Sequence, residues 1–168
     1  MLQLKTINDK VLNLISWSYI MKTFLQYIEE KTVLGLIEFF NIDGIGKIAA
    51  KLDSGNGAYN VIHGEDIQEQ GDKVFFRTAN GRTCLLPKTG EISINVGAGN
   101  IEHRPVVELD FTIGNKEYKN ISFSIGDRSS NLYKILVGKD FIEKDLEALI
   151  DVSQENIADQ NIEAEIKW

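Results

Sequence analysis

Three consecutive residues place a carboxylate, a hydroxyl and a flexible backbone at one point of the chain. Asp53, Ser54 and Gly55 directly follow residues 49–52, a mostly apolar run that is typical of a buried strand. A carboxylate at the end of such a strand is costly to bury without a partner. A second carboxylate is one possible partner, because two like charges at short distance share one proton and can activate water between them. Capping of a loop or helix is the structural alternative for Asp53.

A second apolar stretch far along the chain has a related form. Ile135-Leu136-Val137 leads into Gly138, and residues 139–148 have the pattern of a short helix. Glycine permits close backbone approach. We therefore expect Gly55 and Gly138 to pack closely around the carboxylate, with the Ser54 hydroxyl bracing it by a hydrogen bond.

The chain contains this aspartate motif once. Chemistry that needs two carboxylates therefore requires a second copy of the chain, with both copies of Asp53 meeting at a two-fold axis. We expect catalysis and dimerisation to depend on each other.

Composition narrows the classes of partner. The 168 residues have a net charge of −7 and no Lys/Arg cluster, which argues against nucleic acid as a partner. Cys84 is the single cysteine, so no internal disulfide can form and a reducing compartment is expected. We interpret Cys84 as a small apolar residue that fills space in a strand.

The N-terminal part is rich in large apolar residues but is repeatedly interrupted by polar ones. We expect neither a membrane span nor a secretion signal, and place the protein in the cytoplasm, or in a virion if it is phage-encoded. A helix is predicted from Thr6 or Asn8 to about Lys31, with two adjacent apolar rows. These rows either pack within the chain or form an intermolecular contact.

From Val33 onward, short strands alternate with glycine-bearing turns, which predicts a mainly β fold with a closed or partly closed barrel. We expect an N-terminal helical extension at 1–31, a barrel domain at 32–153 with one short internal helix, and an acidic C-terminal tail at 154–168. Turns are predicted at Asp43-Gly44, Asn80-Gly81 and Gly114-Asn115. Strands are predicted at 33–42, 47–52, 59–63, 74–77, 83–86, 92–96, 104–113, 117–125 and 149–152.

Several segments, taken in order, resemble the bacterial family named ATP-dependent zinc proteases, which has a retropepsin-like fold. The resemblance covers about residues 33–153. The matching segments are residues 34–38, Ala50-Lys51-Leu52-Asp53-Ser54-Gly55, 58–63, Arg104-Pro105-Val106-Val107, Asp127-Arg128-Ser129, 136–141 and 149–152.

This resemblance implies a retropepsin-like aspartic endopeptidase that cleaves peptides as a homodimer with one Asp53 per chain. Ser54 and Gly55 would complete the catalytic motif, and a hairpin between Ile92 and Val107 would serve as a flap. Gly138, Arg128 and His63 would belong to the framework or the substrate side. Where the family has threonine and arginine, this chain has Ser54 and Lys139, and its loop before His63 is one residue longer.

The residues of this chain support neither the zinc ion nor the ATP that the family name mentions. His63, His103 and Cys84 lack the close spacing of zinc ligands, and we expect no metal. Gly44-Ile45-Gly46-Lys47 lacks the earlier glycine and the following hydroxyl of a phosphate-binding loop. We therefore expect no cofactor.

The roles of two residues stay open. His63 either lies near the site or caps a strand end, and Arg128 either supports the site or forms a structural ion pair. The alternative function is a non-catalytic assembly module, for example in a phage particle, that docks onto other subunits through its N-terminal helix.

Overall fold

A computed structural model describes residues 17–23, 31–57, 59–97 and 99–160. The chain divides into two compact units, Met1–Thr32 and Val33–Trp168. Within the predicted N-terminal helix, residues 17–23 are helical, and the rest of that prediction lies outside the described residues. None of the helices described is long and apolar enough to cross a membrane.

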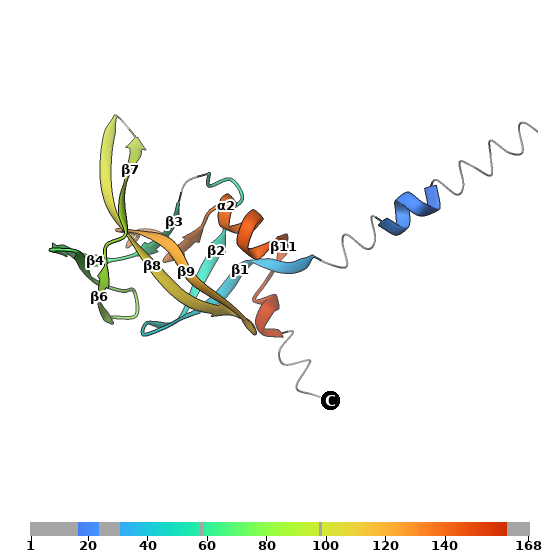
Figure 1. The fold of residues 1–168 in the computed structure, drawn as a ribbon, viewed down its shortest axis with the longest axis horizontal. Helices are drawn as coiled ribbons and strands as arrows, with labels where there is room; N and C mark the ends of the chain where they lie inside the picture. Colours follow the sequence, from blue (N-terminus) through green and yellow to red (C-terminus); the bar gives the residue numbers. More distant parts are fainter. Residues whose placement is uncertain (1–16, 24–30, 58, 98, 161–168) are drawn as a thin grey trace, which may run out of the picture. The chain divides into compact units, whose positions relative to one another are not determined.

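A closed barrel of six strands forms the centre of the second unit (Figure 1). Its strands follow the order β1-β2-β10-β3-β9-β8, and β8 pairs back to β1. Strands β11 and β7 extend the sheet beyond β1 and β8. The strands of this sheet are β1 (Thr32–Ile42), β2 (Gly46–Leu52), β3 (Asn60–His63), β7 (Gly90–Gly97), β8 (Asn100–Ile113), β9 (Lys116–Gly126), β10 (Ile135–Val137) and β11 (Ala148–Glu155). The predicted mainly β barrel is therefore confirmed.

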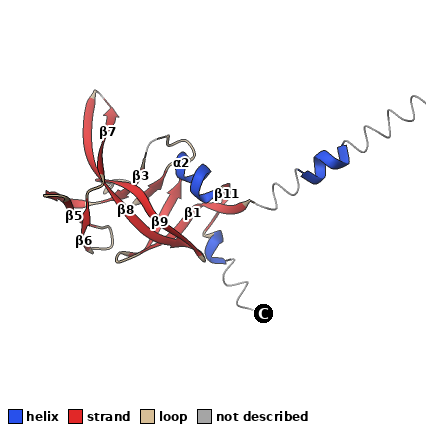
Figure 2. Cartoon of the chain, in the orientation of Figure 1, coloured by secondary structure: helices blue, strands red, loops and turns tan. Residues whose placement is uncertain are grey.

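A separate three-stranded sheet follows β3 and consists of β4 (Glu65–Gln70), β5 (Lys73–Arg77) and β6 (Thr83–Pro87). The alternating pattern predicts β5 and β6 but misses β4. Residues 66–70 of β4 are exposed on both faces, so the strand has no apolar alternation to detect. Beyond this sheet, β7 and the first half of β8 form a hairpin that projects from the barrel (Figure 2).

Aromatic rings fill the barrel interior. Phe111 stacks on Phe40 with ring centroids 4.7 Å apart and meets Phe123 edge-on at 5.9 Å. Phe141 reaches the same cluster from the short helix α2 (Lys139–Phe141), with its ring 5.9 Å from Phe111. The internal helix is thus anchored against the core by one aromatic side chain.

The internal helix is shorter and wider than predicted. A helix over 139–148 is expected from the sequence, but α2 continues as a π-helix, η1 (Ile142–Leu146), and stops at Glu147. Glu147 has a positive φ of 49°, a left-handed conformation that ends a helix. Strand β11 begins directly afterwards, which leaves room for its pairing with β1.

A buried carboxylate fastens the C-terminal residues to β1. Glu38 is fully buried, and its Oε1 accepts hydrogen bonds from the backbone N–H groups of Gly35 at 2.7 Å and Ile157 at 3.0 Å. Its Oε2 accepts the N–H of Ala158 at 3.3 Å. Strand β11 continues to Glu155, three residues beyond the predicted strand end and two beyond the predicted domain boundary. Residues 157–160 form a helical turn against the barrel.

Candidate functional site

The loop that follows β2, here called the Asp53 loop, is hydrogen-bonded to the end of β10, which runs parallel to β2. Leu52 at the end of β2 is opposite Val137 at the end of β10, and the Asp53 N–H donates to the Val137 carbonyl at 3.0 Å. The Lys139 N–H donates to the Asn56 carbonyl at 2.8 Å. The structure thus brings Asp53, Ser54 and Gly55 to the same end of the barrel as Gly138.

The Asp53 carboxylate is oriented by its own loop. The Gly55 N–H donates to Oδ1 at 3.1 Å, and Lys51 Nζ lies 3.7 Å from Oδ2. About a third of the Asp53 side chain, 32%, is exposed. Ser54 is exposed, and its hydroxyl has no hydrogen bond to any other residue that the structure describes. The predicted bracing by Ser54 is therefore not made within one chain.

Asn60 holds Gly138, the residue between β10 and α2. Its Oδ1 accepts the N–H of Gly138 at 2.9 Å, and its Nδ2 donates to the Ser122 carbonyl at 3.2 Å. The Asn60 side chain joins β3, β9 and the start of α2 in this way. Sequence reasoning missed Asn60 and Lys51. The available signal was a polar residue at the start of the apolar segment Val61-Ile62.

An open cavity of about 400 Å³ lies beside the carboxylate. Asp53 and Ser54 form one side, while Leu149 and Val152 of β11 form another. Leu149 is 40% exposed and Val152 is 73% exposed. Strand β11 is the last strand in the sheet order, so a partly apolar sheet edge adjoins the carboxylate.

The strand register separates His63 and Arg128 from this carboxylate. Along β3 and β10, Val61 is opposite Leu136 and Ile62 is opposite Ile135, so His63 comes level with the residue before β10. The Asp53 loop, in contrast, joins the opposite end of β3. Two groups of predicted site residues therefore lie at opposite ends of the same strands.

His63 and Arg128 belong to a structural hydrogen-bond network. The His63 ring is buried, and its Nδ1 accepts the Arg128 backbone N–H at 2.9 Å. The neutral ring must then have its proton on Nε2, which lies 3.3 Å from Glu65 Oε1. The Arg128 Nε donates to the Tyr133 carbonyl at 3.1 Å. Burial, and then the nearby charge of Arg104, lower the pKa of the Arg128 guanidinium.

The part of the chain that the structure describes contains no group of three His, Cys, Asp or Glu side chains able to hold a metal ion. His103 is exposed at the hairpin, where its Nδ1 lies 3.1 Å from the Ser93 hydroxyl. Cys84 is half-buried in β6, and burial raises the pKa of its thiol, as befits a residue that packs rather than reacts.

The fold and site together define a closed mixed barrel with one partly exposed carboxylate beside a sheet edge. No family model and no curated protein matches the chain. Among solved structures, the crystal structure of Lpg0085, a protein of unknown function (DUF785) from Legionella pneumophila subsp. pneumophila str. Philadelphia 1, is similar, with a TM-score of 0.62. The two chains share 24% identity over 76% of this chain and 98% of the other. At 24% identity, this similarity shows a shared fold and nothing about function.

Proposed function

We propose that the protein is a retropepsin-like aspartic endopeptidase that acts as a homodimer with one Asp53 from each chain. The observation behind this proposal is the placement of a partly exposed carboxylate at the junction of two parallel strands, with a backbone N–H directed at its Oδ1. The Asp-Ser-Gly motif occurs once in the sequence, and water activation by this chemistry needs two carboxylates.

The position of β11 favours the dimer. Its exposed Leu149 and Val152 line the same cavity as Asp53. An exposed sheet edge with apolar side chains is a natural surface for a second chain. A two-fold axis close to this cavity would bring the second carboxylate to the first and cover the apolar edge.

The ammonium of Lys51 fits the same proposal. Two carboxylates close together repel each other, and a positive charge 3.7 Å from Asp53 Oδ2 offsets part of that repulsion. The exposed Ser54 hydroxyl would then find its hydrogen-bond partner across the dimer. The hairpin of β7 and β8 would close over the bound peptide as a flap.

Cleavage of a diverse peptide mixture, followed by mass spectrometry, tests the proposal. Asp53→Asn should lower the cleavage rate by at least about a hundredfold, because the amide cannot act as acid or base. Asp72→Asn is the matched control, since Asp72 is exposed in the turn between β4 and β5. Unchanged cleavage by Asp53→Asn, with a normal circular dichroism spectrum, would refute the enzymatic function.

A non-catalytic assembly module is the second candidate, and one observation favours it. Trp17, Tyr19 and Ile20 are 65%, 73% and 53% exposed in the helical residues 17–23. Large exposed apolar side chains on one short helix are typical of an intermolecular contact. In this case a chain without residues 1–31, or with Trp17→Ser and Ile20→Ser, should lose its assembly in light scattering while its barrel stays folded. Normal assembly by both variants would exclude this candidate.

A further inference from the structure

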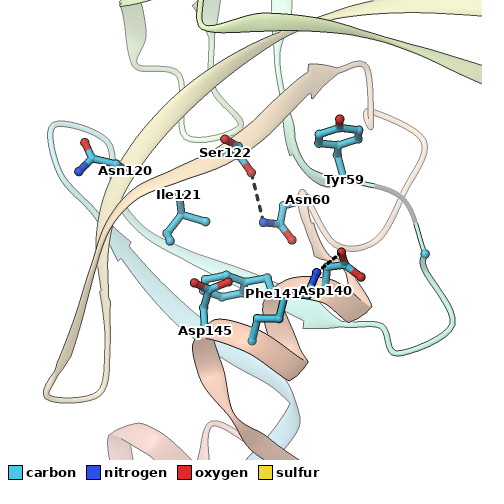
Figure 3. A pocket seen from close by; sticks show the side chains of 10 residues that line it. Tyr59, Asn60, Asn120, Ile121, Ser122, Asp140, Phe141 and Asp145 are labelled. Carbon is cyan, nitrogen blue, oxygen red and sulfur yellow. Dashed lines mark hydrogen bonds and ion pairs between the residues drawn. The ribbon is translucent and has the colours of Figure 1, made fainter.

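The loop between β9 and β10, residues 127–134, is attached to the end of β3 by a buried histidine. Strand β3 starts at Asn60, which Figure 3 shows opposite α2, and ends at His63. The His63 N–H donates to the Lys134 carbonyl at 2.8 Å, and its ring Nδ1 accepts the Arg128 N–H at 2.9 Å. His63 therefore holds the loop near both of its ends.

The 127–134 loop is also bonded to itself. The ammonium of Lys134 donates to three carbonyls, those of Arg128 at 3.0 Å, Ser129 at 2.8 Å and Asn131 at 2.9 Å. The Asn131 N–H donates to the Arg128 carbonyl at 3.0 Å, and Arg128 Nε donates to the Tyr133 carbonyl at 3.1 Å. All of these bonds lie inside the loop, so it can move as one body without breaking them.

A second proton on the His63 ring is incompatible with the bond to Arg128. The ring is 2% exposed, and its neutral form has the proton on Nε2, because Nδ1 accepts the Arg128 N–H. Protonation would place an N–H on Nδ1, directed at the N–H of Arg128. Two donors cannot form one hydrogen bond, so a charged ring must release Arg128.

Two carboxylates make a charged ring possible in this buried position. Glu65 Oε1 of β4 lies 3.3 Å from Nε2, and Asp127 Oδ1 of the loop lies 3.7 Å from Nδ1. Glu65 also pairs with Arg77 of β5, through atoms 2.7 Å apart. Asp127 Oδ1 accepts the Ser129 N–H at 2.8 Å, and its side chain is 69% exposed. A shift of about 1 Å would let Asp127 accept a hydrogen bond from a protonated Nδ1.

The cations near the ring belong to β5, β8 and the loop, and they are Arg77, Arg104, Arg128 and Lys134. Arg104 lies against Gly126, which is opposite His63 in β9, and a Cβ there would meet the guanidinium carbon at 2.7 Å. Arg104 pairs with Glu102 at 2.7 Å. Burial, and then the charge of Arg104, lower the pKa of Arg128. A charge on His63 would add to this repulsion, and outward movement of the loop would relieve it.

We propose that His63 is a pH-sensitive switch for the attachment of the 127–134 loop. With a neutral ring, Nδ1 holds Arg128 and the loop stays on β3. With a proton taken from solvent, Nδ1 donates to Asp127, the Arg128 N–H turns to water and the loop moves outward. The detached loop binds this proton and the attached loop does not, so detachment increases as the pH falls. The switch does not depend on peptide cleavage.

The test is NMR spectroscopy of the full chain at about pH 8 and about pH 5, on either side of the ordinary range of histidine. Imidazole nitrogen shifts identify the protonated ring atoms, and hydrogen exchange relative to the intrinsic rate gives the protection of each amide. The Arg128 amide should lose at least about tenfold in protection at the lower pH, while the amides of β10 keep theirs. The midpoint of this loss should equal the midpoint of the His63 titration.

Three variants make the test specific. His63→Asn keeps an acceptor oxygen close to the position of Nδ1 but cannot be protonated, so Arg128 should be equally protected at both pH values. Asp127→Asn removes the negative charge that favours the charged ring, so the midpoint should move to lower pH. His103→Asn is the matched control, because His103 is the other of the two histidines and is 65% exposed. Its pH dependence should equal that of the wild type.

Equal protection of the Arg128 amide at both pH values would overturn the inference, and so would a His63 ring that is still neutral at about pH 5. The same holds for an unshifted midpoint in Asp127→Asn or for a pH dependence that is lost in His103→Asn. These two variants change exposed side chains, so they decide the question even if the buried His63→Asn substitution unfolds the chain.

Discussion

At the scale of residues, the Asp53 carboxylate takes its partners, among the residues that the structure describes, from its own segment. Gly55 and Lys51 lie within two positions of Asp53. The Gly55 N–H points the positive end of its dipole at the carboxylate, and Lys51 places its ammonium beside it. The sequence motif therefore predicts the loop geometry well, because its partners are consecutive. Asn60 and Gly138 are 78 residues apart, and no local pattern predicts that hydrogen bond.

Glu38 is the residue with the largest predicted effect on stability. It is fully buried in β1 and accepts three backbone hydrogen bonds, two of them from residues near the C-terminus. Glu38→Gln replaces one acceptor oxygen by an amide donor that faces an N–H. The free energy of unfolding should fall by about 1–3 kcal/mol, measured by urea titration.

Glu117→Gln is the control for Glu38→Gln, because the Glu117 side chain is exposed and forms an ion pair with the equally exposed Lys119. Its free energy of unfolding should change by less than about 0.5 kcal/mol. Equal stability of the Glu38→Gln variant and the wild type would show that the C-terminal residues do not depend on this carboxylate.

At the scale of elements, strands with an apolar run or apolar alternation are predictable, and β4, which has neither, is not. Strand β5 alternates between buried and exposed residues and is predicted nearly to its ends, whereas β4 is exposed on both faces and gives no pattern. The helical pattern after Gly138 is also correct, but its widening into η1 is not predicted. The period of apolar residues does not distinguish an α-helix from one short π-turn.

The pairing of β11 with β1 depends on the absence of a side chain at one position. A Cβ atom at Gly35 would lie 2.6 Å from the Gln154 carbonyl oxygen. Gly35→Ala should therefore force β11 away from β1, and amide hydrogen exchange of residues 149–155 should become at least about tenfold faster. If β11 forms the dimer edge, the same variant should also weaken dimerisation.

Gly57→Ala is the matched control for Gly35→Ala, since a Cβ at Gly57 meets no atom within 4 Å. Exchange in β11 should be the same as in the wild type. A Gly35→Ala chain with unchanged protection of residues 149–155 would contradict the close approach of the two strands.

At the scale of the whole molecule, barrel closure follows from pairings that no single segment specifies. Strand β10 inserts between β2 and β3, and β8 returns to β1. Most strands and several of their turns are predictable from the sequence, but this order is not, because each pairing joins distant segments. The same order brings the Asp53 loop and Gly138 together and sends His63 to the opposite end of β3.

A dimeric enzyme should respond to mixing of active and inactive chains. When wild-type and Asp53→Asn chains are mixed in equal amounts and allowed to exchange, random pairing leaves about one quarter of the dimers with two aspartates. Cleavage per wild-type chain should fall to about half. Activity that stays proportional to the wild-type chain would contradict a site shared by two chains.

The most direct test of the account is the distance between the Asp53 carboxylates of neighbouring chains in a crystal structure of the assembled protein. The proposed dimer predicts oxygen atoms within about 3 Å of each other on a two-fold axis. Carboxylates separated by tens of ångströms, or covered by another part of the assembly, would contradict the enzymatic proposal and favour the assembly module.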